Sequence, residues 1–307
     1  MTAEVLEDAN PETRTLFLID PNQKLLGTVV VWNVRGIKGV PYAKIVADLQ
    51  AADLDPDNAK KVLPRNAFIS AAHKLEKGKV ISKLKDEEDR LYFQFTLENK
   101  AKDAVTGKES FVYDFETILN LDKTSGVVAC DEPGHADLIH AAQELVDEAI
   151  ANRNGGQISK IVQRIFENHA DLFPIRDQGG VYFIPIKHKA IQGKVAQFLK
   201  AVGGKLAQMP IPLGTPEGND TARDAVTGGL QKLIDDHRKA IDELKLNTRD
   251  DTLERAAQKI AETRFKIEAY ADYLSTVAKE ELLGAVEDGY ERLKKKTQEI
   301  EQARQNP

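Results

Sequence analysis

The sequence predicts an α+β protein made of three consecutive parts. Between residues 15 and 213 the apolar residues alternate in some segments and recur at helical spacing in others. From 219 to 305 there is no proline, and the helical spacing continues to the end. Among 307 residues, 41% are hydrophobic and 30% are charged, which excludes a wholly disordered chain. We therefore expect an N-terminal α+β domain over 1–153, a middle α+β domain over 154–213 and a C-terminal helical hairpin over 219–305.

The N-terminal part is expected to open with a hairpin of strands 15–19 and 25–34, joined by the turn-forming residues 20–23. Helices follow at 41–52, 57–63 and 65–76, then a hairpin over 79–97 and strands at 111–115 and 126–129, before a helix over 135–152. Three helices followed by a hairpin is the order of a winged helix-turn-helix, in which the third helix enters a major groove. The four acids at 86–89 in the hairpin turn oppose this reading, because they repel phosphate.

The middle part is predicted to be a helix, a hairpin and a second helix. The helices cover about 158–166 and 190–202, and the strands 172–176 and 181–186 flank Gly179 and Gly180. A further strand at 206–213 leads into a linker rich in Pro and Gly, over 210–218.

The C-terminal part is expected to be two antiparallel helices that break at 246–251. The second arm is about 50 residues, or about 75 Å if unbroken, and it overhangs the first. Such an arm does not bury its apolar stripe alone, so we expect it to pack on a second copy of the chain. The residues expected to mediate this oligomerisation are Leu253, Ile260, Ile267, Leu274, Leu282 and Leu293.

Charge is distributed unevenly along the chain. The net charge is −6, yet residues 59–85 hold eight basic residues against Glu76, and residues 157–205 hold eight against three acids. These two basic islands predict a non-enzymatic protein that binds nucleic acid, with DNA favoured, through electrostatic contacts to phosphates. Arg65, Asn66 and Ser70 are the candidates for reading bases. The full set of candidate contacts is Lys60, Lys61, Arg65, Asn66, Ser70, Lys74, Lys77, Lys79, Lys83, Lys160, Arg164, Arg176, Lys187 and Lys189.

Two other functions stay open. The same basic islands are also suited to acidic faces of neighbouring subunits, which predicts a structural or assembly protein without nucleic acid. A minor alternative is a metal-dependent enzyme around residues 131–140, where Asp131, His135 and His140 lie at spacings that match no known metal motif. No phosphate-binding glycine loop or nucleophile elbow occurs in the sequence, so no cofactor and no catalytic residue is expected.

A cytoplasmic protein without a membrane partner is expected. The single cysteine, Cys130, forms no disulfide within the chain, and the first ten residues carry three acids and no apolar signal region.

Two short strings resemble segments of a group of uncharacterised bacterial and phage proteins. They are Leu63-Pro64-Arg65-Asn66-Ala67-Phe68 and Leu172-Phe173-Pro174-Ile175-Arg176, the latter followed by Gly179-Gly180-Val181-Tyr182-Phe183-Ile184-Pro185. The resemblance extends in general layout over residues 15–300. It implies a prokaryotic or mobile-element protein and brings no activity, ligand or catalytic residue.

Overall fold

The computed structural model describes residues 24–102, 109–176 and 180–305. The chain is a mixed α+β protein with antiparallel sheets, and the described residues form eight α-helices. It divides into two compact units, each built from segments that are distant in the sequence. Unit 1 contains the chain up to Asn33, Phe166–Gly193 and everything from Leu206 onward, whereas unit 2 contains Val34–Ile165 and Lys194–Lys205. The three parts expected from the sequence are consecutive, so their limits differ from those of the two units.

Unit 1 contains a four-stranded sheet in the order β10-β1-β9-β8. Its strands are β1 (Leu25–Asn33), β8 (Phe173–Pro174), β9 (Tyr182–Pro185) and β10 (Lys205–Pro212). β1 pairs with β9 in antiparallel register, with Gly27 opposite Pro185. The backbones approach so closely here that a Cβ on Gly27 would lie 2.3 Å from the Ile184 carbonyl oxygen. The strand predicted at 15–19 lies outside the described residues, so the expected N-terminal hairpin is not tested.

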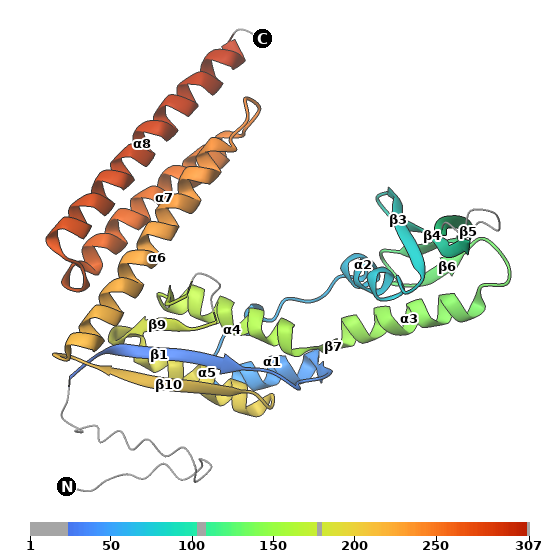
Figure 1. The fold of residues 1–307 in the computed structure, drawn as a ribbon, viewed down its shortest axis with the longest axis horizontal. Helices are drawn as coiled ribbons and strands as arrows, with labels where there is room; N and C mark the ends of the chain where they lie inside the picture. The colour runs from blue at the N-terminus through green and yellow to red at the C-terminus, as the bar shows by residue number, and fades with distance from the viewer. Residues whose placement is uncertain (1–23, 103–108, 177–179, 306–307) are drawn as a thin grey trace, which may run out of the picture. The chain divides into compact units, whose positions relative to one another are not determined.

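Three helices complete unit 1: α6 (Pro216–Asp242), α7 (Asp250–Ala269) and α8 (Thr276–Gln305), which pack side by side (Figure 1). The unbroken second arm predicted from the sequence is wrong. After Ala269 the chain makes a 3₁₀ turn, Ala271–Tyr273, and reverses into α8.

Tyr270 and Tyr273 explain the break between α7 and α8. Tyr270 is 1% exposed and packs edge-on against Phe173 of β8, at 5.0 Å between ring centroids. The Tyr273 hydroxyl donates to the Leu26 carbonyl oxygen of β1 at 2.8 Å. These contacts with the sheet hold the chain in a turn that the local helical pattern does not reveal.

The apolar stripe predicted to mediate oligomerisation lies inside the three-helix bundle. Leu253, Ile260, Ile267, Leu282 and Leu293 are each at most 8% exposed, and the partly buried Leu274 packs against the same core. The third helix thus covers the stripe that was expected to need a second copy of the chain.

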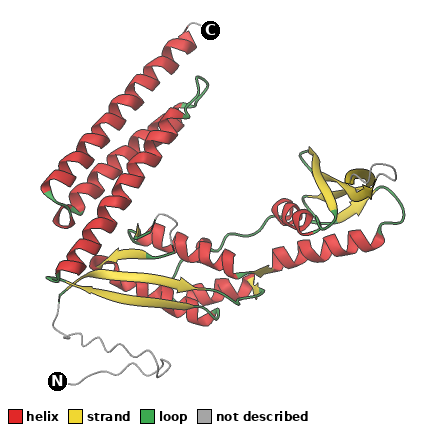
Figure 2. Ribbon diagram, in the orientation of Figure 1, coloured by secondary structure: helices red, strands yellow, loops and turns green. Residues whose placement is uncertain are grey.

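Unit 2 contains a four-stranded antiparallel sheet whose strand order, β3-β4-β5-β6, follows the sequence. Figure 2 draws the strands of the protein in yellow and its helices in red. The strands are β3 (Lys79–Asp86), β4 (Arg90–Lys102), β5 (Glu109–Asp122) and β6 (Val128–Cys130). Two helices, α2 (Pro64–Lys74) and α3 (Ala136–Ala151), share one core with a single face of this sheet. The core residues from the sheet are Leu91, Phe93, Phe95, Leu119, Leu121 and Val128.

The helix predicted over 57–63 is wrong. Only a 3₁₀ turn, Pro56–Asn58, follows α1 (Tyr42–Ala51), and residues 59–63 form a loop. The Asp55 carboxylate accepts a hydrogen bond from the Asp57 backbone N–H at 2.9 Å, and the Asn58 side chain donates back to the Asp55 carbonyl. These side-chain bonds to the backbone replace those of a helix. Of the winged-helix order, the first helix is present as α1, the third as α2 and the hairpin as β3–β4, whereas the middle helix is absent.

The remaining elements are two short strands that pair with each other, two helices and a 3₁₀ turn. They are β2 (Val40–Pro41), β7 (Asn152–Arg153), α4 (Gly155–His169), the 3₁₀ turn Ile186–His188 and α5 (Lys189–Ala201). At the end of α3, the guanidinium of Arg153 donates to the carbonyl oxygens of Ala149 and Ile150, both at 3.1 Å. Arg153 thus satisfies carbonyls that a helix end leaves without partners. Among the described residues, no helix has the length and apolar character needed to cross a membrane.

Candidate nucleic-acid interface

The first basic island forms one surface of unit 2, made by α2 and the adjoining strand β3. Ala67, Phe68, Ala71 and Ala72 of α2 face the core. The opposite side of the helix exposes Asn66, Ser70, His73 and Lys74. β3 is an edge strand of the sheet, and most of its residues are exposed. We call the exposed side of α2, the loop 59–63 and β3 the α2–β3 surface.

Asp86, at the end of β3, neutralises much of the charge at the start of α2. Its carboxylate accepts from Arg65 at 2.5 Å and lies 2.9 Å from the ammonium group of Lys123 and 3.6 Å from that of Lys83. The hydrogen bonds from Arg65 and Lys123 hold the pKa of Asp86 well below its usual range. Asp86 is one of the four acids that seemed to oppose phosphate binding, yet here it joins β3 to α2. Arg65 is consequently engaged with Asp86 and does not project freely towards a base.

Two further side-chain contacts use residues of the same island. Lys79 lies 2.7 Å from the Glu116 carboxylate of β5, and both side chains are less than 20% exposed. His73 and Glu76 pair at 2.6 Å on the exposed side of the α2 terminus. Lys79 and Lys83 therefore already interact with carboxylates of unit 2.

Lys60, Lys61, Lys74 and Lys77 are different, because all four are exposed and none has a carboxylate within 4.0 Å among the described residues. Lys74 is the last residue of α2, and Lys77 lies in the turn between α2 and β3. Lys60 and Lys61 lie in the loop that leads into the helix. These four ammonium groups are the cations of the α2–β3 surface that are available to a ligand.

The backbone beneath Lys60 and Lys61 is held in place by three side chains. The Tyr42 hydroxyl donates to the Ala59 carbonyl oxygen at 2.9 Å, and the Arg164 guanidinium donates to that of Asn58. Arg153 reaches the Lys60 carbonyl oxygen at 3.5 Å. The loop is thus preorganised, which lowers the entropic cost of a ligand contact. Arg164, predicted to bind nucleic acid, instead supports this loop.

The second basic island is divided between the two units. Lys160 and Arg164 belong to unit 2, whereas Arg176, Lys187 and Lys189 belong to unit 1. Lys160 and Lys189 are exposed, as is Arg176. The predicted sites of this island therefore do not form a single surface within one unit.

Lys187 belongs to a polar cluster of unit 1, which also contains the half-buried Asp171 and His188, the exposed Lys266 and the buried Tyr270. The Asp171 carboxylate lies 2.6 Å from the Lys266 ammonium group and accepts a hydrogen bond from the Tyr270 hydroxyl. His188 Nε2 is 3.3 Å from the same carboxylate, and the Lys187 ammonium group lies over the Tyr270 ring at 3.9 Å. These contacts tie the bundle to the residues around the sheet.

The environment of this cluster shifts three pKa values. Burial raises the pKa of Asp171, but the hydrogen bonds from Lys266 and Tyr270 outweigh it and leave the pKa below its ordinary value. Burial lowers the pKa of His188. Burial and the Asp171 carboxylate raise the pKa of Tyr270. At neutral pH the cluster thus holds a carboxylate, a neutral imidazole and a neutral phenol, with two lysines.

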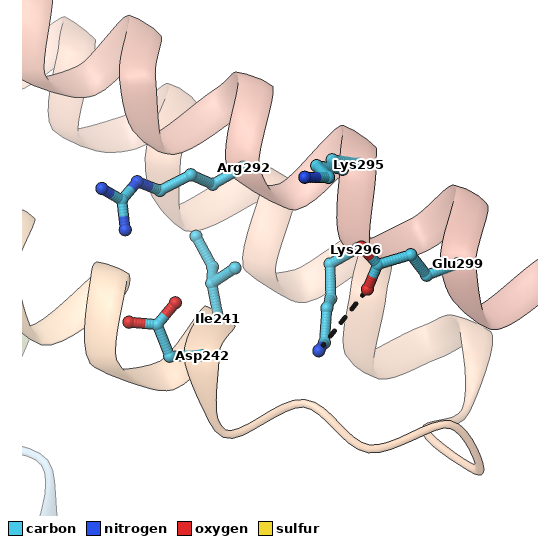
Figure 3. A pocket seen from close by; sticks show the side chains of 6 residues that line it. All are labelled: Ile241, Asp242, Arg292, Lys295, Lys296 and Glu299. Carbon is cyan, nitrogen blue, oxygen red and sulfur yellow. Dashed lines mark ion pairs between the residues drawn. The ribbon is translucent and has the colours of Figure 1, made fainter.

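A small hollow of about 220 Å³ lies beside α6 and α8 (Figure 3). Its lining includes Arg292, Lys295 and Lys296, with Asp242 and Glu299 as the acids. Lys296 pairs with Glu299 at 3.7 Å. Its volume is below the 300–1,000 Å³ typical of small-molecule sites, so we assign it no ligand.

The residues weighed as a metal site lie at the start of α3. Asp131 and Glu132 are in the exposed turn before the helix, His135 immediately precedes α3, and His140 pairs with Glu144 at 3.3 Å. Across 24–102, 109–176 and 180–305, no group of three or more His, Cys, Asp or Glu residues could hold a metal ion.

The sequence reasoning missed a row of exposed aromatic side chains on β5. Phe111, Tyr113 and Phe115 are 53%, 56% and 52% exposed, and they alternate along the strand. Strands normally place large apolar side chains in the core, so this segment was interpreted only as one more strand of a sheet. The sequence does carry a signal for this row, because Phe111, Tyr113 and Phe115 alternate with Val112 and Asp114 directly after a charged stretch.

Comparison with known proteins identifies the family without a function. No curated protein matches the chain, and no solved structure matches it. One family model matches residues 25–306 and thus covers both units. This agrees with the expected resemblance to uncharacterised proteins. The chain therefore belongs to the Family of unknown function (DUF6744).

Proposed function

We propose that this protein binds nucleic acid through the α2–β3 surface of unit 2. The observation that carries the proposal is the set of four exposed ammonium groups, Lys60, Lys61, Lys74 and Lys77, beside a helix whose nearby acids already have partners. In a protein of net charge −6, such a surface concentrates positive potential where phosphates can approach.

The proposal rests on phosphate contacts more than on base reading. Asn66 and Ser70 are exposed on α2 and able to reach base edges, whereas Arg65 is bound to Asp86. Docking of α2 in a major groove, with the β3–β4 hairpin beside it as in a winged helix, is the duplex form of this proposal.

The assembly alternative predicts that the basic islands pack on acidic faces of neighbouring subunits. Oligomerisation through the apolar stripe is a separate prediction, and the third helix of the bundle covers that stripe. We therefore do not carry oligomerisation through Leu253, Ile260 and their neighbours into the proposal.

Fluorescence polarisation at several salt concentrations tests the proposal with labelled duplex and single-stranded oligonucleotides. We expect affinity to fall steeply with salt, because each phosphate contact releases counterions. Replacing Lys74 and Lys77 with Gln should weaken binding and reduce the slope of log K against log salt by about 1.5.

The matched control replaces Lys232 and Lys239, which are exposed on α6 of unit 1, with Gln. It makes the same change in net charge and should leave binding nearly unchanged. If neither oligonucleotide binds at low salt, the proposed function is wrong. If the two double variants weaken binding equally, the α2–β3 surface is the wrong location.

A further inference from the structure

The unit 2 sheet has one face in the core and one that carries exposed side chains. Leu91, Phe93 and Phe95 of β4 point into the core shared with α2 and α3. The alternate residues of β4 therefore point to the opposite face, which we call the open face of the sheet. The hydrogen bond between Gln94 and Thr96, at 3.2 Å, fits their position on that face.

The aromatic row lies on this open face. Thr96 pairs with Phe115, Glu98 with Tyr113 and Lys100 with Phe111, so the three rings share the face of the alternate β4 residues. A register shift beside Phe95 leaves Glu116 as the additional residue of β5, and Glu116 pairs with Lys79. Thr117 faces the core and is 0% exposed. Regular alternation would put Phe115 on the same side as Thr117, but the bulge between them places Phe115 on the open face.

The spacing of the rings favours a single strand over a duplex. Alternate residues of a strand are about 6.8 Å apart, twice the rise of about 3.4 Å per base in a duplex strand. Bases in a duplex are already stacked on one another and offer no free face. An extended single strand can place one base on each ring, because aromatic side chains stack on any base.

The row begins beside the lysines of the α2–β3 surface. Val80 of β3 pairs with Thr96 of β4, which pairs with Phe115 of β5. Two strand spacings, or about 10 Å, therefore separate Phe115 from the β3 residue that follows Lys79. Lys77 lies just before β3, and at the far end of the row the Lys100 ammonium group lies 5.9 Å from the centre of the Phe111 ring. One carboxylate, that of Glu98, lies opposite Tyr113.

We propose that Phe111, Tyr113 and Phe115 form a stacking platform for a single-stranded nucleic acid, with Lys77 and Lys100 contacting phosphates at the two ends of the row. This inference rests on the proposed function and specifies its ligand class. A strand bound by the lysines at the end of α2 is led across β3 and β4 onto Phe115, and then along β5.

The test measures binding of the full chain to three labelled probes: oligothymidylate, an abasic strand of the same length and a duplex. We expect oligothymidylate to bind more tightly than both others, because only it offers unstacked bases. Replacing each aromatic residue with Ala should weaken its binding about 5-fold or more, and the triple replacement should weaken it at least about 100-fold. Binding of the abasic strand should stay unchanged.

Two matched variants control for lost apolar surface. Val112→Ala alters the opposite side of the same strand, and Phe265→Ala removes a 75% exposed ring from α7 of unit 1. Both should bind oligothymidylate as the unaltered protein does. Because all three rings of the row are exposed, the triple variant should keep its circular dichroism spectrum and thermal midpoint.

The outcomes separate the two proposals. If the unaltered protein binds none of the three probes, the proposed function itself is wrong. If the triple variant keeps the salt-dependent binding of the unaltered protein, only the stacking platform is overturned. The same holds if the unaltered protein binds the abasic strand and oligothymidylate equally well. If the triple variant binds normally but loses self-association in light scattering, the open face docks a second copy of the chain, and the platform is again overturned.

Discussion

Removing the Tyr270 hydroxyl should destabilise unit 1 without disturbing its packing. In Tyr270→Phe the ring keeps its edge-on contacts with Phe173 and Tyr273, at 5.0 and 5.9 Å. The variant loses the hydrogen bond to the Asp171 carboxylate. A hydrogen bond to a charged group contributes about 1.5–3 kcal/mol. Since Asp171 retains Lys266 at 2.6 Å, its carboxylate is not left alone, and we expect a loss near the lower limit, about 1.5–2 kcal/mol.

Urea denaturation followed by fluorescence measures this loss. The only tryptophan, Trp32, lies in β1 and stacks on Tyr182 with ring centroids 5.0 Å apart, so its emission reports the unfolding of unit 1. Tyr273→Phe is the matched control, because its hydroxyl donates to the uncharged Leu26 carbonyl and should contribute about 0.5–1.5 kcal/mol. The Asp171→Asn and Tyr270→Phe double-mutant cycle isolates the coupling between the two groups. A coupling energy near zero would refute the reasoning that a charge-assisted bond joins the bundle to the sheet.

Three other predictions use the same fluorescence assay. Gly229→Ala should lower the free energy of unfolding by about 1–3 kcal/mol, because its Cβ would lie 2.6 Å from the buried Phe173 ring. The neighbouring Gly228→Ala, whose Cβ would have nothing within 4 Å, should be neutral or stabilising by up to about 1 kcal/mol, and equal effects of the two changes would contradict this packing. Unit 1 should lose stability as pH falls below 6.5, the ordinary pKa of histidine, because the lowered pKa of His188 in the folded state means that the unfolded chain binds more protons. Replacing His188 with Asn should flatten this pH dependence of stability, and an unchanged curve would exclude this histidine as the cause. Ile260→Ala should cost about 2–5 kcal/mol with a midpoint independent of protein concentration, whereas a concentration-dependent midpoint would mean that the stripe is shared between copies.

The elements that the sequence predicted well are those specified by local patterns. Helix 65–76, with Pro64 before it, corresponds to α2, and the alternation over 79–97 corresponds to β3 and most of β4. Helix 135–152 corresponds to α3 within one residue at each end. In these segments the apolar period alone decides which face is buried.

The errors arose where distant residues decide the local structure. The turn that ends α7 depends on Tyr270 and Tyr273 meeting Phe173 and Leu26, which lie about 100 and 250 residues earlier in the chain. The seven-residue spacing of Leu253, Ile260, Ile267 and Leu274 extends across the turn, and it slips by one residue only at Leu282. The loop at 59–63 likewise depends on residues about 100 positions later in the chain. Arg153 of β7 donates to the Lys60 carbonyl oxygen, and Arg164 of α4 donates to that of Asn58, just before the loop.

The candidate site was predicted in part. Spacing on α2 correctly identified its exposed side, because helical periodicity separates Ala67 and Phe68 from Ser70 and Lys74. Charge counting could not distinguish lysines with partners from those without, since Asp86 and Glu116 are brought to the island only by the folded sheet. The aromatic row was missed because a bulge, which no pattern marks, decides which face of β5 its rings occupy.

The strand order of unit 1 has a consequence for synthesis on the ribosome. β1 is made first among the described strands, yet both neighbours in its sheet, β9 and β10, follow about 150 residues or more later. The continuous stretch of unit 2, from Val34 to Ile165, emerges in the interval and contains its complete sheet with α2 and α3. Unit 2 is therefore expected to acquire structure during translation, while β1 stays unpaired, with its backbone groups hydrogen-bonded to water, until its partners have been made.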